Sequence, residues 1–501
     1  MAAPEGQIRF LVPMKIPVLA PALFALATLP AFAAPDLVNR LSWGITANGA
    51  GAERAWLEQQ LHPGDDDGLP PQAVDQIAAL DISRKPMTEI AIAVKQLQLQ
   101  AKAAKGTDGA KDARKPYQQA LNDLERQAQT RSLLRDLYSR NQLKEQLTWF
   151  WFNHFNVFAK KGEIRAMVGD YEETAIRPHV LGKFRDLLAA TVFHPAMIQY
   201  LDNQQNAAGK INENYAREIM ELHTMGVGSG YSQADVQELA RILTGVGVNL
   251  TGIPRRVGPQ IREQYVSDGL FEFNPRRHDY GDKTFLGHAI KGSGLQEVSD
   301  AIDILSRQPA TARFVSAQLA QYFCCDAPSP ALVAAMTATW QHSDGDIAAV
   351  LRTLFDSKEF GASLGHKFKD PMHYAVSAVR LVYGDQVIAN TQPILNWLNR
   401  MGEPLFGHET PDGYPLTEAA WAGPGQIATR FEIARQIGAG APQLFRADGD
   451  TVTRPPPPVL EQTAWYQALQ LPTATRDAVT QGATPADRNM LLLSSPQFMR
   501  R

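Results

Sequence analysis

Carboxylates at helical spacing are the first sign of chemistry in this sequence. The stretch 212–224 reads NENYAREIMELHT, and helical geometry turns about 100° per residue. The side chains that then share one face are Asn214, Arg217, Glu218 and Glu221. Two carboxylates on one face can bind a metal or exchange protons with a substrate. The same pattern also fits a solvated face carrying an ordinary Arg217–Glu221 ion pair.

Two further candidate residues, His223 and His154, lie on predicted helices. His223 falls opposite the polar face, among apolar residues, which predicts a histidine that faces the core. The stretch 140–158 is apolar nearly all round, and His154 continues its stripe of Leu143, Leu147 and Phe150. A buried imidazole needs a hydrogen-bond partner or a ligand, so His154 is either a satisfied core residue or part of a site.

A third group of candidate residues lies in the irregular stretch 273–288. His278 and Asp279 occur together there, close to Gly281 and Lys283. Ordered loops position functional side chains on rigid scaffolds, which favours a site, although a surface turn would fit the same residues.

Together these residues predict a cleft between the helix 212–224 and the loop 273–288. The candidate catalytic residues are Glu218, Glu221, His278, Asp279 and Lys283. The candidate metal ligands are His154, Glu218, His278 and Asp279. Imidazole and carboxylate ligands suit zinc, manganese or iron. These residue types favour a hydrolase. The bond that it would cleave is not defined, because the sequence contains neither HExxH nor GxSxG.

The two cysteines, Cys324 and Cys325, are adjacent and follow an apolar helical pattern. Two small buried residues are favoured over a vicinal disulfide, whose geometry would be strained. A cysteine-ligated zinc site is not expected, because the sequence holds no other cysteine.

Composition excludes some classes of protein. The 501 residues are 44% hydrophobic and 20% charged, as in an ordinary globular protein. The net charge of −3 provides no general basic surface, so a nucleic-acid partner is not expected.

The N-terminal residues indicate export. Met14-Lys15 precedes the apolar run IPVLAPALFALATLPAFAA, and Ala31-Phe32-Ala33 fits the small-x-small rule for signal cleavage. We therefore interpret residues 1–33 as a signal peptide with an upstream extension, cleaved near Ala33; an uncleaved anchor is the alternative. No later run reaches the ~18 apolar residues of a membrane span, so the product is expected to be periplasmic or secreted.

Helical patterns dominate the rest of the chain and predict an all-α fold built mainly of helical hairpins. One irregular segment around 250–291 is rich in Gly and Pro, and short β-strands are expected within it. We expect one helical domain over 34–453. A proline linker beginning at Arg454 and the final helices make up 454–501, and these helices are expected to pack on the same domain.

Several strings in order resemble the bacterial family named domain of unknown function 1800. They are WFNHFNVF (151–158), YAREIMELHTMGVGSGYSQADVQELARILTG (215–245), FNPRRHDYGDKTFLG (273–287), HSDGDIAAVLRTLFDSKEF (342–360), PLFGHETPDGYP (404–415) and the closing SSPQFMRR. The resemblance implies an exported protein and a partner from another exported family, domain of unknown function 1501. It marks most of the candidate residues named above but implies no catalytic assignment.

Two functions therefore compete. One is an exported hydrolase that uses the predicted cleft. The other is a non-catalytic helical scaffold or assembly partner, in which His154, His223 and Glu218 form a buried polar network. The positions of His154, Glu218, Glu221 and His278 relative to one another distinguish the two.

Overall fold

The computed structural model describes residues 34–46, 54–384, 386–446, 459–463, 466 and 471–501. The predicted signal peptide (1–33) and the predicted proline linker (454–458) lie outside the described residues.

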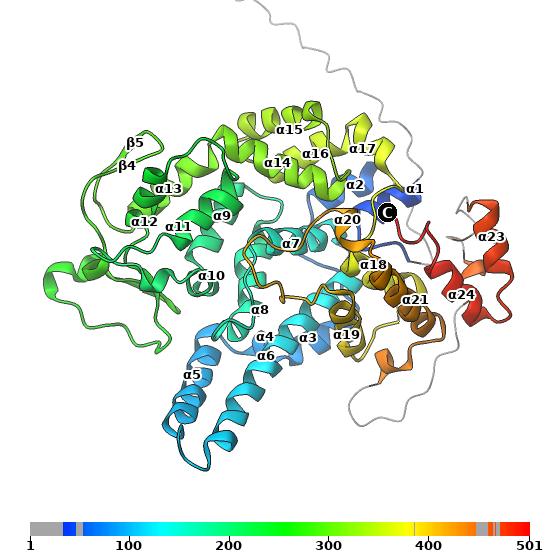
Figure 1. Ribbon diagram of the computed structural model, residues 1–501, viewed down its shortest axis with the longest axis horizontal. Helices are drawn as coiled ribbons and strands as arrows, with labels where there is room; N and C mark the ends of the chain where they lie inside the picture. The colour runs from blue at the N-terminus through cyan, green and yellow to red at the C-terminus, as the bar shows by residue number, and fades with distance from the viewer. Residues whose placement is uncertain (1–33, 47–53, 385, 447–458, 464–465, 467–470) are drawn as a thin grey trace, which may run out of the picture. The chain divides into compact units, whose positions relative to one another are not determined.

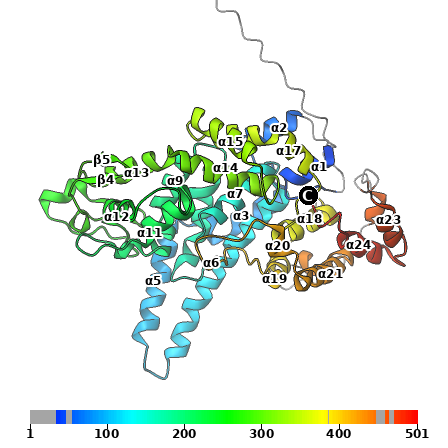
Figure 2. The same ribbon diagram turned by 45° about the horizontal axis from the view of Figure 1, so that its top comes forward.

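Helices dominate the described part of the chain, which confirms the all-α prediction (Figure 1). Those of the first half are α1 (Ala34–Leu41), α2 (Arg54–Leu61), α3 (Pro71–Ala79), α4 (Asp81–Arg84), α5 (Met87–Ala103), α6 (Ala110–Tyr138), α7 (Gln142–His154), α8 (Val168–Asp170), α9 (Phe184–Phe193), α10 (Pro195–Tyr200), α11 (Asn214–Glu218) and α12 (Gln233–Ile242). α5 and α6 lie side by side as a helical hairpin in both views (Figure 2).

The helices of the second half commonly begin with proline after a capping residue. They are α13 (Gln296–Ser306), α14 (Pro309–Phe323), α15 (Pro330–His342), α16 (Ile347–Phe355), α17 (Lys358–Ser363), α18 (Pro371–Tyr383), α19 (Gln392–Met401), α20 (Glu418–Trp421), α21 (Pro424–Gly438), α23 (Thr473–Thr480) and α24 (Pro485–Leu493). Ser329 caps α15 and Asp370 caps α18, and proline follows because the first helical N–H needs no partner. α24 packs on α21, and Asn489 donates a hydrogen bond to the carbonyl of Gly438.

The described strands all lie within 246–290, close to the segment where short strands are expected. β1 (Val246–Val248), β3 (Phe271–Phe273) and β2 (Val266–Asp268) form an antiparallel sheet in that order. β4 (Lys283–Phe285) and β5 (His288–Ile290) form a hairpin. Its turn residues, Leu286 and Gly287, have φ of 48° and 79°, the left-handed conformation that tight hairpin turns require.

The helix predicted over 212–224 changes type along its length. α11 ends at Glu218, and the chain continues as a π-helix, η5 (Ile219–Thr224). The hydroxyl of Thr224 donates to the carbonyl of Ile219, five residues earlier. A pattern of 3.6 residues per turn does not predict this wider turn. The prediction of one α-helix over 212–224 was therefore wrong for residues 219–224. A capping box starts α12: the Ser232 hydroxyl accepts from the N–H of Asp235, and the Asp235 side chain accepts from the N–H of Ser232.

Residues far apart in sequence meet in the core at Arg40 of α1. Its buried guanidinium donates to the carbonyl of Arg501 at 2.6 Å and to that of Cys324 at 3.0 Å. The guanidinium of Arg501 in turn donates to the carbonyl of Tyr322 and to the side chain of Gln146. These hydrogen bonds therefore hold α1 and α7 against α14 and residue 501.

Among the helices that the structure describes, none combines the length and the apolar character needed to cross a membrane.

Candidate functional site

The candidate site is built around the end of α7. This helix is apolar on nearly every side and almost entirely buried, as its sequence predicts. Three polar side chains, Asn153, His154 and Asn156, are held at its end among buried aromatic rings. Because buried polar groups need partners, the hydrogen bonds of these three residues define the site.

The two asparagines hold the loop 404–416 against α7. Asn153 donates to the carbonyl of Tyr414 at 2.9 Å and accepts from the N–H of Tyr414 at 2.6 Å. Asn156 donates to the carbonyls of His408 and Thr410. Through these contacts the string WFNHFNVF binds the backbone of the string PLFGHETPDGYP.

The loop can approach α7 this closely only because residue 413 is glycine. Gly413 has φ of 71°, and a Cβ atom there would lie 2.2 Å from the carbonyl oxygen of Asn153. Any side chain at this position would therefore push the loop away from the helix.

Two π-helices contact α7 or its end, and each carries a candidate acid. η2 (Tyr171–Ile176) contains Glu172, and η5 contains Glu221. The carbonyl of His223 in η5 contacts the ring of His154 directly. Single-turn π segments are rare and are frequent at functional sites, which supports this region as the functional centre.

An open groove, called here the His154 groove, runs from the loop 404–416 along α14 and α15. Its volume is about 1030 Å³, and its polar lining includes His154, Glu221 and Asp412 from three separate segments. A second hollow of about 350 Å³ shares His154 and Asp412 and continues toward Tyr414. The part of the groove along α15 is mostly apolar, and Val227 at its edge is 75% exposed.

His154 is held as a neutral base at the inner end of this groove. Its Nε2 lies 3.0 Å from the carbonyl oxygen of His223, and its Nδ1 lies 3.2 Å from Oε1 of Gln318. Burial lowers the pKa of His154, so the ring is neutral at physiological pH. A neutral ring has one N–H and can donate to only one of these oxygens, so the other ring nitrogen keeps its lone pair.

The carboxyl groups near the groove have opposite pKa shifts. Burial raises the pKa of Glu218, and the carboxylates of Glu221 and Asp412 raise it further. Burial would also raise the pKa of Asp412, but hydrogen bonds from Thr410 and His408 outweigh it and lower the pKa. Paired groups whose environments move their pKa values apart are typical of acid and base pairs.

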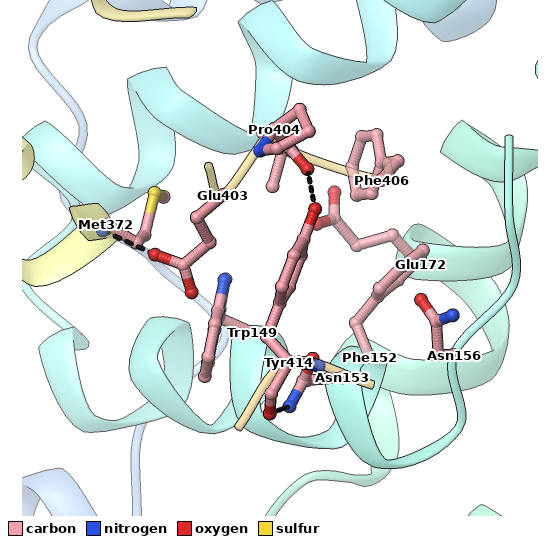
Figure 3. A pocket seen from close by; sticks show the side chains of 11 residues that line it. Trp149, Phe152, Asn153, Asn156, Glu172, Met372, Glu403, Pro404, Phe406 and Tyr414 are labelled. Carbon is pink, nitrogen blue, oxygen red and sulfur yellow. Dashed lines mark hydrogen bonds between the residues drawn. The ribbon is translucent and has the colours of Figure 1, made fainter. Parts of the chain in front are cut away.

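A small enclosed cavity lies behind the groove. Its volume of about 20 Å³ is room for one water molecule, and Asn153 and Tyr414 line both this cavity and the outer hollow. Figure 3 shows the carboxyl groups of Glu403 and Glu172 on opposite sides of the Tyr414 ring. The Tyr414 hydroxyl donates to the carbonyl of Pro404, which fixes the ring as a wall between the two spaces.

Both carboxyl groups at this cavity have raised pKa values. Burial raises the pKa of Glu172 to about 7, although Ser132 donates a hydrogen bond to it. Burial, followed by the charge of Asp370, raises the pKa of Glu403 well above its usual range. Met372 donates its N–H to one oxygen of Glu403, while the other oxygen has no partner among the described residues.

The predicted site residues of the loop 273–288 do not line this groove. His278 and Lys283 are fully enclosed, and both contact Glu297 of α13, at 2.8 and 2.5 Å. Asp279 pairs with Arg241 at 2.8 Å, and the hydrogen bond from Arg241 lowers the pKa of Asp279 to about 2. These three residues therefore hold the β segment to α12 and α13.

The four predicted metal ligands, His154, Glu218, His278 and Asp279, are not brought together. Within the described ranges, the group of three ligating side chains with mutually close donor atoms is Cys324, Cys325 and Glu359. The physical reason is that His278 and Asp279 are engaged by Glu297 and Arg241, whereas His154 faces two carbonyl oxygens. Of the residues predicted for the cleft between 212–224 and 273–288, Glu221 lines the His154 groove, whereas His278, Asp279 and Lys283 pair with residues of α12 and α13.

Sequence reasoning placed His154, Glu218 and Glu221 in a site but missed three acids. Asp412 had a signal, since Pro-Asp-Gly marks a turn and His408 precedes it by four residues. Glu172 and Glu403 had none, because their environments arise only from packing between distant segments.

Comparisons with known proteins agree with the resemblance of the sequence strings. Neither the curated proteins nor the solved structures include a match to this chain. A family model described as "Protein of unknown function (DUF1800)" matches residues 36–500. Because this match spans nearly the whole chain, the protein belongs to the DUF1800 family.

Proposed function

We propose that this protein is an exported hydrolase whose active site is the His154 groove. The observation that supports this most directly is that His154, Glu221 and Asp412, from three separate segments, line one groove. Convergence of an imidazole and carboxylates on a groove suits general acid and base chemistry.

The roles follow from the electrostatics of the acids. Asp412 is the general base, because hydrogen bonds from Thr410 and His408 keep it ionised and able to take a proton from the attacking water. Glu218, three residues before the groove residue Glu221, is assigned as the general acid, because burial and the carboxylates of Glu221 and Asp412 raise its pKa. Glu221, paired with Arg217 at 3.3 Å, orients the substrate at the edge of the groove.

Export is part of the proposal and rests on the N-terminal sequence alone. We expect the mature protein to begin near Ala34. N-terminal sequencing of the protein recovered from the extracytoplasmic fraction checks this, and an intact residue 1–33 segment on that protein would contradict it.

The experiment measures turnover of the mature chain on chromogenic carboxyl esters, glycosides, phosphate esters and peptide anilides. Asp412→Asn and Glu218→Gln are expected to lower kcat/KM on the accepted class by about 10²–10⁴-fold, as loss of a general acid or base does. Glu409→Gln is the matched control, because Glu409 is an exposed acid of the same loop. Full activity of both site variants, with the fold verified by circular dichroism, would refute the proposal.

A second function is favoured by the apolar part of the groove and by the exposed side chain of Val227. In this alternative the groove binds a segment of another exported protein, such as one of the domain of unknown function 1501 family, without catalysis. Val227→Asp would then abolish binding of that purified partner, whereas Asp412→Asn would preserve it, and no substrate class would be hydrolysed.

A further inference from the structure

A cluster of three potential metal ligands, called here the thiol cluster, lies apart from the His154 groove. Cys324 and Cys325 follow the last residue of α14, and Glu359 lies in the first turn of α17. Both thiols are free, their Sγ atoms are 3.1 Å apart, and Sγ of Cys325 lies 3.6 Å from Oε1 of Glu359. Cys324 is buried, whereas Cys325 and Glu359 are partly accessible.

We propose that Cys324, Cys325 and Glu359 bind one divalent thiophilic cation of the zinc type, with the fourth position open to water. This site is independent of the proposed hydrolase activity. From the sequence, a cysteine-ligated zinc site is not expected, because the chain has no third cysteine. The structure supplies a carboxylate from another helix instead.

The distances fit tetrahedral coordination with a small adjustment. Zinc lies about 2.3 Å from thiolate sulfur and about 2.0 Å from carboxylate oxygen, which places tetrahedral sulfur and oxygen ligands roughly 3.5 Å apart. The observed separation between Cys325 and Glu359 is 3.6 Å. Two tetrahedral sulfurs should lie roughly 3.8 Å apart, so the pair must open slightly from 3.1 Å. The partly exposed Cys325 side chain can make this movement.

The surroundings of the cluster balance its charge. Two thiolates and one carboxylate carry three negative charges, so a divalent cation leaves one uncompensated. The Arg40 guanidinium, which donates to the carbonyl of Cys324, lies close enough to interact with both thiols. Glu359 is already fixed as an acceptor, because both the N–H and the hydroxyl of Ser329 donate to it.

Metal binding changes the protonation of the thiols. In the free protein, burial raises the pKa of Cys325 to about 12, so this thiol is protonated at neutral pH. A bound cation replaces both thiol protons, which pass to solvent as two sulfur–metal bonds form. No electron is transferred, and no oxidant is needed.

The test uses the reduced full-length mature chain and Co²⁺ as a spectroscopic substitute for Zn²⁺. We expect one equivalent of Co²⁺ to produce a thiolate-to-cobalt charge-transfer band and the intense visible bands of tetrahedral cobalt, and Zn²⁺ to displace it. Cys325→Ser should remove most of the charge-transfer band and weaken Zn²⁺ binding by at least about tenfold. Glu359→Gln should weaken binding while retaining thiolate bands. Asp356→Asn, an exposed acid near α17, is the control and should leave binding unchanged.

Two further measurements guard against misfolded variants. Bound Zn²⁺ should protect Cys325 of the unmodified chain from alkylation, and Zn²⁺ binding should release two protons per cation. Absence of thiolate bands in the Co²⁺ complex would overturn the proposal. A Cys324–Cys325 disulfide in protein isolated without reductant, detected by mass spectrometry, would also overturn it.

Discussion

At the scale of single residues, the buried carboxyl of Glu172 couples the stability of the protein to pH. Burial raises its pKa from 4.5 to about 7, so the folded state retains a proton that the unfolded state releases. Its stabilising contribution is complete below pH 4.5 and is lost as the pH rises through about 7. A shift of this size corresponds to roughly 3 kcal/mol.

We therefore expect Glu172→Gln to reduce the loss of stability between pH 5 and pH 8. Urea unfolding at the two pH values measures the change. Glu173→Gln is the matched control, because Arg135 outweighs burial and lowers the pKa of Glu173. That variant should lose most at neutral and higher pH, where the native ion pair is fully formed. An unchanged pH dependence in Glu172→Gln would show that this carboxyl does not hold the proton.

The sequence could predict the burial of histidines that continue an apolar helical stripe, because a buried imidazole needs a partner. His154 was expected to be buried with a hydrogen-bond partner or a ligand, and its ring contacts the backbone carbonyl oxygen of His223 and the side-chain oxygen of Gln318. His223 was expected to face the core, and it is buried. The partner of His278 could not be predicted, because Glu297 is one of many helical acids and only tertiary packing selects it.

At the scale of elements, the close approach of the loop 404–416 to α7 depends on Gly413. We expect Gly413→Ala to destabilise the fold by about 1–3 kcal/mol, because the methyl group would overlap the carbonyl of Asn153 and strain the backbone. Hydrogen exchange should show faster opening of residues 408–414, and thermal unfolding gives the total loss.

The variant Gly209→Ala distinguishes the cost of backbone strain from the cost of steric overlap with a neighbouring atom. Gly209 has φ of 74° but no atom within 4 Å of the added Cβ, so this variant carries the backbone strain alone. Equal losses in the two variants would contradict the importance of the contact with Asn153.

Element types followed from the periodicity of apolar residues, but the details that shape the site did not. Helical hairpins, of which α5 and α6 form one, and the buried α7 were expected from local patterns. The π-helices η2 and η5 were not, because each is a local widening that neighbouring contacts select. The site could therefore be located only in part, since those segments carry Glu172 and Glu221.

At the scale of the whole molecule, the sequence-predicted site divides into two separate parts. The His154 groove carries the proposed chemistry, while His278, Lys283 and Glu297 form a buried ion network elsewhere. We expect Glu297→Gln to cost about 3–5 kcal/mol, because Lys283 would remain buried without its counter-charge. Denaturant unfolding measures the loss.

The same variant tests whether the two parts are independent. Below its unfolding transition, Glu297→Gln should bind and turn over groove ligands as the unmodified protein does. A selective loss of turnover in the folded variant would return His278 and Lys283 to the catalytic machinery.

The hydrogen bond between Arg40 and the carbonyl of Arg501 has a consequence for how the chain folds. Arg40 is buried, and one of its acceptors lies 461 positions further along. Without residue 501 the guanidinium would lose one acceptor inside a closed core and would keep those of Phe323, Cys324 and Ser363. We therefore expect the core around Arg40 to close completely only when the distal segment has joined it.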